Sequence, residues 1–157
     1  MKHFDITIPV TEVTFDELTQ GDRDLVEAAR EATTRSYAPY SHFHVGAAIR
    51  LDNGEIITGA NQENVAYPSG TCAERSACFY AHARYPEARF ETIAIAARGT
   101  DGEEVEAPIA PCGACRQALL EYETLAGHDV RVILVGRHRI FILPSVKSTL
   151  PLAFVEF

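Results

Sequence analysis

The sequence predicts an α/β fold of three layers, in which a mixed sheet of about five strands carries helices on both faces. Two observations support this fold class. Short apolar runs typical of buried strands alternate along the chain with longer segments whose apolar residues recur at helical spacing. In addition, only Gly136-Arg137-His138 joins the last two predicted strands, which is too short for a crossover. That pair is therefore expected to be antiparallel.

The first half of the chain predicts one helix and a hairpin. Residues 22–36 form the helix, because apolar residues recur at helical spacing and acidic residues stand at its front. Pro39 ends this stretch, since proline cannot continue a helix. Strands are predicted at 45–51 and 55–59, because the intervening Asp52-Asn53-Gly54 is the commonest short hairpin signal.

The second half predicts two helices and three strands. The helices are expected at 72–85, which ends before a proline, and at 113–122. The strands are expected at 93–97, 130–135 and 139–143, where apolar residues run together. Between the first of these strands and the second helix lies a turn-rich acidic loop.

Composition bounds the class of protein. The chain has 157 residues, which is enough for one domain that spans 1–157. Within it, residues 1–20 have weak periodicity and form either a strand or an ordered arm. The net charge of −8 argues against binding nucleic acid through its phosphates. No apolar run approaches a membrane span and no secretory leader is recognisable, so a cytoplasmic location is expected. There, four cysteines indicate metal binding or catalysis before disulfides.

Three cysteines and one glutamate at the starts of two predicted helices carry the chemistry. Cys112 and Cys115 are three positions apart, so both thiols face one side of a helix and can bind one metal ion. Three thiolates, with Cys72, leave a tetrahedral zinc ion one open position for water. Glu74 lies roughly 200° around the helix from Cys72 and is free to move protons. Helix N-termini and Arg75 offset the negative charge of the thiolates.

Two other interpretations of these cysteines remain. Cys-x-x-Cys before a helix is also a redox signature, although the third cysteine, Cys72, and the lack of a tryptophan before Cys112 favour zinc. A closed structural site would need Cys78 as a fourth ligand. Because Cys78 lies more than a helical turn from Cys72, we expect it to be a small buried hydrophobic residue.

Five segments of the chain carry a family resemblance. They are YAPYSHFHVGAAI (37–49), NQENVAY (61–67), TCAERSA (71–77), PCGACRQ (111–117) and LPLAF (150–154). The Cys-x-Glu and Pro-Cys-x-x-Cys motifs within them match a signature known for zinc deaminases, with cysteine in place of histidine as first ligand. Together the five segments resemble the small, homotetrameric, zinc-dependent cytidine deaminases. The resemblance implies the three-layer cytidine-deaminase-like fold and a pyrimidine salvage hydrolase.

The resemblance also implies the reaction. Cytidine and 2′-deoxycytidine would be converted to uridine and 2′-deoxyuridine with release of ammonia. Cys72, Cys112 and Cys115 would bind one zinc ion in each subunit, and zinc-bound hydroxide would attack C4 of the base. Glu74 would accept the proton of the water, protonate N3, and later protonate the departing amino group. The backbone N–H of Ala73 would bind the base carbonyl.

Further residues are assigned to the substrate by the same resemblance. Asn61 and Glu63 match the pair that binds the sugar 3′-hydroxyl, and the carboxylate disfavours nucleotides. Phe43 matches the aromatic residue that packs on the base. Tyr67 and Phe154 match residues that reach a neighbouring subunit's site, which implies a homotetramer with shared active sites. Around the metal ligands, the expected supporting residues are Arg75 and Gln117.

Other functions remain open on the sequence. A deaminase of another small aminopyrimidine nucleoside, such as blasticidin S, would use the same residues. A nucleic-acid editor is disfavoured by the acidic charge, and a zinc-stapled structural module is the alternative outside catalysis. His42 and His44 stand where related sequences commonly carry other residues, which affects the geometry of the substrate loop.

Overall fold

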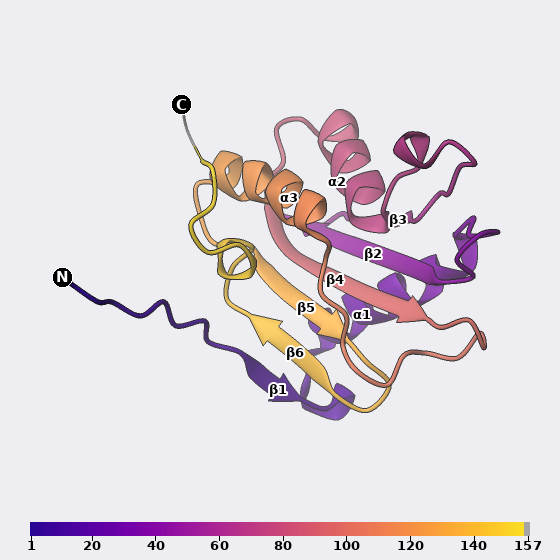
Figure 1. The fold of residues 1–157 in the computed structure, drawn as a ribbon, viewed down its shortest axis with the longest axis horizontal. Coiled ribbons are helices and arrows are strands. Elements are labelled where there is room, and N and C mark those ends of the chain that lie inside the picture. The colour runs from indigo at the N-terminus through magenta and orange to yellow at the C-terminus, as the bar shows by residue number, and fades with distance from the viewer. Residues whose placement is uncertain (156–157) are drawn as a thin grey trace.

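A six-stranded mixed sheet forms the middle of the structure (Figure 1). The computed structural model describes residues 1–155. Its strands are β1 (Thr11–Val13), β2 (His44–Leu51), β3 (Ile56–Ala60), β4 (Phe90–Arg98), β5 (Arg131–Val135) and β6 (Ile140–Leu143). Its longer helices are α1 (Gln20–Ala32), α2 (Ala73–Arg84) and α3 (Gly113–Ala126). None of the helices in the described part is long and apolar enough to cross a membrane.

The strand order is β1-β6-β5-β4-β2-β3. Only β4 and β5 pair in parallel, because α3 crosses over between them, and the other neighbours are antiparallel. The predicted antiparallel pairing of the last two strands is confirmed. The expectation of about five strands is corrected to six. The sixth, β1, has three residues, which is too short to display a period in the sequence.

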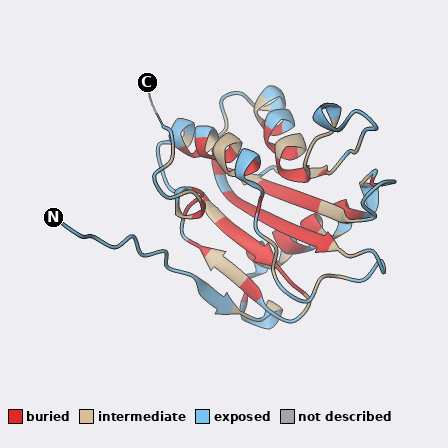
Figure 2. Cartoon of the chain, in the orientation of Figure 1, coloured by how far each residue is buried: buried red, intermediate tan, exposed pale blue. Residues whose placement is uncertain are grey.

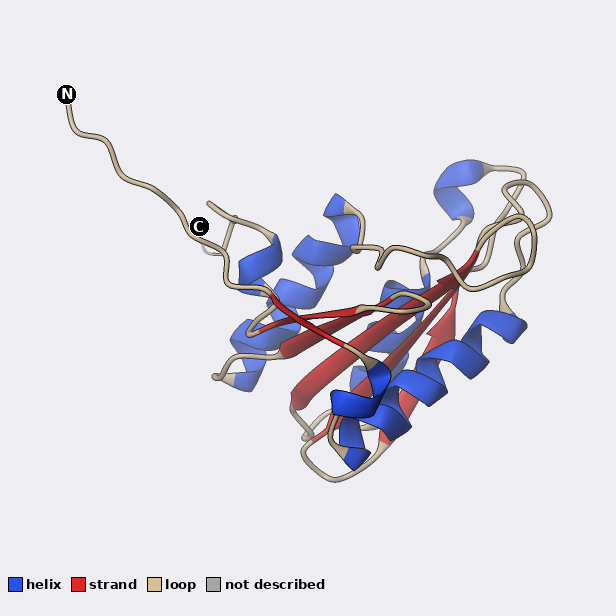
Figure 3. Ribbon diagram, turned by 90° about the horizontal axis from the view of Figure 1, so that it is seen from below, coloured by secondary structure: helices blue, strands red, loops and turns tan. Residues whose placement is uncertain are grey.

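Helices cover both faces of the sheet, as the sequence predicts. Helix α1 packs on one face, and α2 and α3 pack on the other (Figures 1 and 3). Neighbouring residues along a strand serve opposite faces: Ile93 and Ile95 belong to the core under α2 and α3, whereas Ala94 belongs to the core under α1. The central strands are therefore buried on both sides (Figure 2), which explains their continuous apolar runs.

Two glycines set the distance between helices and sheet. A Cβ on Gly46 of β2 would lie 2.2 Å from the carbonyl oxygen of Ala29 in α1. A Cβ on Gly59 of β3 would lie 2.5 Å from the backbone nitrogen of Ala77 and 2.6 Å from the carbonyl oxygen of Ala73, both in α2. Because no side chain fits in these spaces, α2 is seated directly on the edge strand of the sheet.

Two buried carboxylates tie distant segments together, and sequence patterns did not mark either of them. Glu123 of α3 accepts backbone hydrogen bonds from Val130 (2.9 Å), Val146 (2.7 Å) and Lys147 (3.0 Å). It thereby joins the end of α3 to the start of β5 and to the segment after β6. A buried carboxylate persists only with such partners.

The second buried carboxylate, Asp22 of α1, lies beside two arginines. Arg131 of β5 donates two hydrogen bonds to it, at 3.2 and 3.0 Å, and Arg50 of β2 lies 3.6 Å away. Burial by itself would raise the pKa of Asp22, but the hydrogen bonds and charge of Arg131, with the charge of Arg50, hold it below its usual value.

Candidate active site

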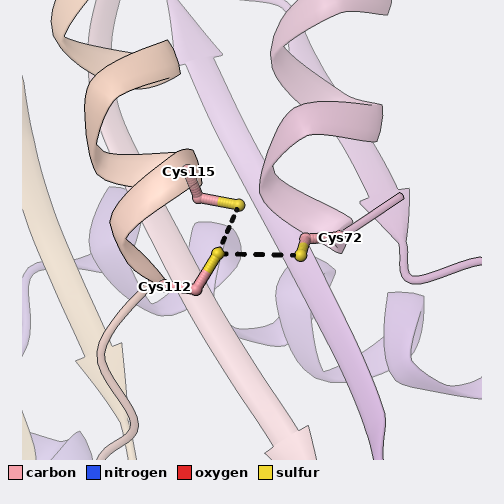
Figure 4. A group of neighbouring side chains, drawn as sticks. All are labelled: Cys72, Cys112 and Cys115. Carbon is pink, nitrogen blue, oxygen red and sulfur yellow. Dashed lines mark hydrogen bonds between the residues drawn. The ribbon is translucent and has the colours of Figure 1, made fainter. Parts of the chain in front are cut away.

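The three predicted metal ligands meet at the N-termini of two helices (Figure 4). Cys72 is the residue before α2, Cys112 is the residue before α3, and Cys115 lies in the first turn of α3. The Sγ atom of Cys112 lies 3.9 Å from that of Cys72 and 3.5 Å from that of Cys115. All three sulfur atoms lie within 4.8 Å of one another.

These distances fit a zinc ion. Tetrahedral ligands at a Zn–S distance of about 2.3 Å are separated by about 3.8 Å from one another. All four cysteines are free thiols. Cys78 is fully buried, outside the three-thiol group, with its thiol directed at the carbonyl of Arg75 at 3.6 Å. The prediction that Cys78 is a buried core residue is confirmed, and the three thiols match an open catalytic site better than a closed structural one.

Positive groups balance the charge of the thiolates. Hydrogen bonds from the Cys115 thiol and from Arg75 together lower the pKa of Cys72 to about 5, against the effect of burial. The Arg75 guanidinium lies 3.7 Å from the Cys72 sulfur, as the sequence predicted for a supporting cation. The hydrogen bond to Cys72 and burial raise the pKa of Cys115. The partial positive charge at both helix N-termini acts in the same direction as Arg75.

Glu74 lies beside this cluster in the first turn of α2. It is only 4% exposed, and it does not belong to the group of three ligands. Burial raises the pKa of Glu74, the negative charge of Cys72 adds to the increase, and a hydrogen bond with Cys115 opposes it. A carboxyl group whose proton affinity is raised next to a metal centre is suited to carry protons.

An open pocket of about 410 Å³ lies against Cys72 and Arg75. Its volume lies in the usual range for small-molecule sites. Three of the residues predicted to contact substrate, Asn61, Glu63 and Tyr67, line it. Polar groups therefore surround the space next to the metal ligands.

Asn61 fixes the backbone that enters β2. Its Oδ1 atom accepts a hydrogen bond from the backbone N–H of Val45 at 2.8 Å, and its Nδ2 atom donates to the carbonyl of Phe43 at 2.9 Å. Phe43 is half-buried immediately before the strand. Asn61 therefore holds the backbone of the aromatic residue expected to pack on the base.

Glu63 fixes the preceding loop. Its Oε2 atom accepts backbone hydrogen bonds from Tyr40 (2.9 Å) and Ser41 (3.2 Å). A hydrogen bond from the Ser41 side chain, followed by that from the Tyr40 backbone, holds the pKa of Glu63 below its usual value. Gln62, between the two, exchanges two backbone hydrogen bonds with Thr71, the residue before the first metal ligand. One short segment thus aligns the substrate loop with the metal centre.

The two aromatic residues expected to reach a neighbouring subunit are exposed. Tyr67 is 77% exposed and lines the pocket of its own chain, where its ring meets the edge of Tyr40 at a centroid distance of 6.3 Å. Phe154 is 65% exposed and is not one of the described residues that line the pocket. Its carbonyl accepts a hydrogen bond from Gln117 at 2.9 Å.

The expectation for Gln117 is therefore corrected. Its amide holds the C-terminal segment and does not donate to the metal ligands, because a residue two positions after Cys115 points to another side of the helix. The neighbouring Arg116 has a role that the sequence interpretation missed. It donates to the carbonyls of Pro111 (2.7 Å) and Thr149 (2.6 Å) and so fixes the loop that carries Cys112. In the sequence, the position of Arg116 four residues after Cys112 was the only indication of this role.

The two unusual histidines lie in the substrate loop and at its exit. His42 adopts a left-handed backbone conformation with a φ of 54°, between Ser41 and Phe43. The Nδ1 atom of His44 is hydrogen-bonded to the hydroxyl of Ser36. His42 thus lies in the loop that Glu63 holds, and His44 begins β2 directly after that loop.

Comparison with known proteins places this site in a family. Residues 19–126 match the family model described as the cytidine and deoxycytidylate deaminase zinc-binding region. A protein of Halalkalibacterium halodurans named cytidine deaminase is 39% identical over 130 residues, which cover 83% of this chain and 91% of that protein. A blasticidin-S deaminase of Bacillus cereus is 38% identical over 108 residues, covering 67% of this chain and 75% of that protein.

A solved structure agrees with the sequence comparison. The crystal structure of a cytidine deaminase from Burkholderia pseudomallei matches with a TM-score of 0.70 and 38% identity, and the match covers 87% of this chain and all of that one. The matched region contains all three cysteines and Glu74 within the family's zinc-binding region. With its α/β fold and its zinc-binding cysteines, this chain belongs to the cytidine deaminase family.

Proposed function

We propose that this chain, acting as one domain over 1–157, hydrolyses cytidine and 2′-deoxycytidine to uridine and 2′-deoxyuridine with release of ammonia. One observation carries the proposal: the buried carboxyl group of Glu74 lies beside three convergent thiols at two helix N-termini, next to an open pocket. The relatives named cytidine deaminase support this choice of substrate.

Glu74 is the proposed proton carrier. Cys72, Cys112 and Cys115 would hold zinc, which when bound lowers the pKa of a water molecule to about 7 and makes it a nucleophile. Glu74 accepts one proton from water and donates it to N3 of the pyrimidine. It then takes the second proton of that water, from the hydroxyl group now bound to C4, and donates it to the departing amino group. Its raised pKa favours the protonated form needed for the two donations. Acid–base help of this kind contributes about 10²- to 10⁴-fold in rate.

The remaining contacts select a free nucleoside. The backbone N–H of Ala73, at the first position of α2, is proposed to donate to the base carbonyl. Phe43 is proposed to pack on the base. Asn61 has one Nδ2 hydrogen left after its bond to Phe43, and the carboxylate of Glu63 can accept more hydrogen bonds than those from Tyr40 and Ser41, so both can still bind the 3′-hydroxyl. The negative charge of Glu63 would repel a phosphate at that position.

Assembly and location complete the proposal. We propose a homotetramer in which Tyr67 and Phe154, both exposed aromatic residues, extend towards the active site of a neighbouring copy. Neither nucleic acid nor a membrane is an expected partner of this acidic chain. A cytoplasmic location suits the chemistry, because a reducing compartment keeps the zinc-binding cysteines as free thiols.

Turnover of purified enzyme tests the proposal. Absorbance should fall when the zinc-loaded enzyme is mixed with cytidine or deoxycytidine, and deoxycytidine monophosphate should react far more slowly. Glu74→Gln should retain one zinc ion per chain and lose turnover, while Glu121→Gln, on the exposed face of α3, serves as the control. Stoichiometric zinc in an enzyme that converts neither nucleoside would overturn the proposal.

A second candidate is a deaminase of the nucleoside antibiotic blasticidin S. The 38% identity to a protein of that name favours it, and it would use the same zinc and glutamate chemistry. The ratio of kcat/KM values for the antibiotic and for cytidine decides between the two. A ratio above one would favour the antibiotic, and a ratio below one would favour cytidine.

A further inference from the structure

Residues 1–10 form an extended arm that leaves the body of the protein and leads into β1 at the edge of the sheet (Figures 1 and 3). All ten residues are exposed. Within the described chain, no hydrogen bond or ion pair is made by any of them. The arm therefore owes its position to few contacts with its own chain.

The arm has one apolar side. Phe4, Ile6, Ile8 and Val10 occupy every second position, and their exposed fractions are 80, 51, 40 and 49%. Side chains at every second position of an extended segment point to the same side. The arm thus presents a continuous apolar stripe to solvent, as a strand does when one face is meant for burial.

A groove lies along this stripe. Ile6 and Ile8 line one wall of a cavity of about 400 Å³, and the segment 145–155 near the C-terminus lines the other. Leu152, in that opposite wall, is 87% exposed. The volume would accommodate several apolar side chains, so the groove has room for another segment between its walls.

The charge around the groove favours a second copy of this chain as the occupant. The whole chain carries −8, so most of its surface repels another copy. By contrast, the arm and the segment 145–155 contain only Lys2, Asp5 and Lys147 as charged side chains, which sum to +1. Two copies that met here would therefore face little of the electrostatic repulsion that the whole chain's charge produces.

We propose that the apolar arm of one copy docks in the groove of a second copy, and that the two arms pack antiparallel about a two-fold axis. Such an arrangement is self-complementary, because a two-fold rotation places the apolar stripe of one arm against the identical stripe of the other. Residues 4–8 of the two arms pack their apolar side chains and exchange backbone hydrogen bonds, and this ladder stops before Pro9, which has no N–H.

Hydrogen exchange of the arm amides, combined with sedimentation of the zinc-loaded full chain, tests the proposal. In the associated protein, amides of residues 4–8 should exchange at least tenfold more slowly than in an unstructured peptide. Ile6→Asp should abolish this protection and weaken association, because it places a charge in the apolar contact. His3→Asp adds a negative charge near the start of the arm without removing any of its four apolar residues, and should retain the protection.

Each other result would overturn the proposal. Unprotected arm amides in a protein that sediments as an oligomer would mean that the arm is not at the contact. Protection that persists in a monomer at high dilution would mean that the arm folds onto its own chain. Equal protection in the wild type and Ile6→Asp would mean that the apolar stripe is not the contact surface. None of these readouts involves turnover.

Discussion

The side-chain amide of Asn61 makes two hydrogen bonds to the backbone around His44. It accepts one from the N–H of Val45 at 2.8 Å and donates one to the carbonyl of Phe43 at 2.9 Å. Phe43 is thus held by a residue at the end of a strand far from it in sequence. Asn61, which lines the substrate pocket, thus also sets the backbone position of Phe43.

Replacing Asn61 tests whether its two hydrogen bonds affect substrate binding as well as the free energy of unfolding. Asn61→Asp replaces the amide donor with a carboxylate that faces the Phe43 carbonyl, so stability should fall by about 1–3 kcal/mol and KM for cytidine should rise. Chemical denaturation and steady-state kinetics measure the two effects. Asn53→Ala, which removes a side-chain hydrogen bond to Glu55 in the exposed hairpin turn, should leave KM unchanged. An unchanged KM in Asn61→Asp would contradict the clamping role.

Zinc content should depend on three cysteines and not on the fourth. Wild type and Cys78→Ala should contain about one zinc ion per chain, since a catalytic site keeps three protein ligands. Cys112→Ala should lose most of its zinc and its activity. Elemental analysis after dialysis measures the metal, and a chelator should lower the Tm of the wild type because bound metal stabilises the folded state. Full zinc retention by Cys112→Ala would contradict the assignment.

Gly59 should control the position of the first turn of α2. In Gly59→Ala the new Cβ collides with backbone atoms of Ala73 and Ala77, so the helix must shift. We expect a loss of about 1–3 kcal/mol in stability, with weaker zinc binding because Cys72 moves with the turn. In the control Gly21→Ala, the new Cβ meets only the flexible end of Arg50 at 3.4 Å, so stability should be unchanged or slightly raised.

Glu123 should be more important for stability than a charged helix residue usually is. In Glu123→Gln one oxygen is replaced by a donor that faces backbone N–H groups, which costs about 1–3 kcal/mol for each donor left unpaired. Urea denaturation measures the loss. The matched variant Glu121→Gln, exposed on the same helix, should change stability by less than about 0.5 kcal/mol. Equal stability of the two variants would mean that the hydrogen bonds from Val130, Val146 and Lys147 to Glu123 do not stabilise the fold.

Acid stability should depend on Asp22. Its folded-state pKa lies below its unfolded value of about 3.9, so between these values the unfolded state binds more protons. The contribution of the ion pair with Arg131 is therefore present above the unfolded pKa and is lost as the pH falls through the folded pKa. The unfolding free energy of Asp22→Asn should fall less steeply below pH 4 than that of the wild type. The control Asp24→Asn removes an exposed carboxylate of the same helix, and its unfolding free energy should fall with pH as steeply as that of the wild type.

The regular elements were predictable because their patterns are local. Helical spacing in α1 and the continuous apolar run of β4 reflect burial on one face or on two, and burial acts on every residue of the element. The end of α3 was predicted four residues too early, because Gly127, which ends it in a left-handed conformation, lies beyond the last strong apolar repeat. Strand β1 lies within residues 1–20, where the sequence left a strand and an ordered arm both open, because its three residues depend on pairing with β6.

The sequence by itself determined the fold class through the spacing of its apolar residues and the family through five matching segments. It also determined the metal ligands, because the spacing of Cys112 and Cys115 already places two thiols on one side of a helix. The tertiary structure alone decided how Cys72 meets them, that Asn61 and Glu63 also hold the substrate loop, and that Gln117 binds the C-terminal segment instead of the ligands. These contacts join residues far apart in the chain, and their distances follow from the packing of helices on the sheet, which no local pattern encodes.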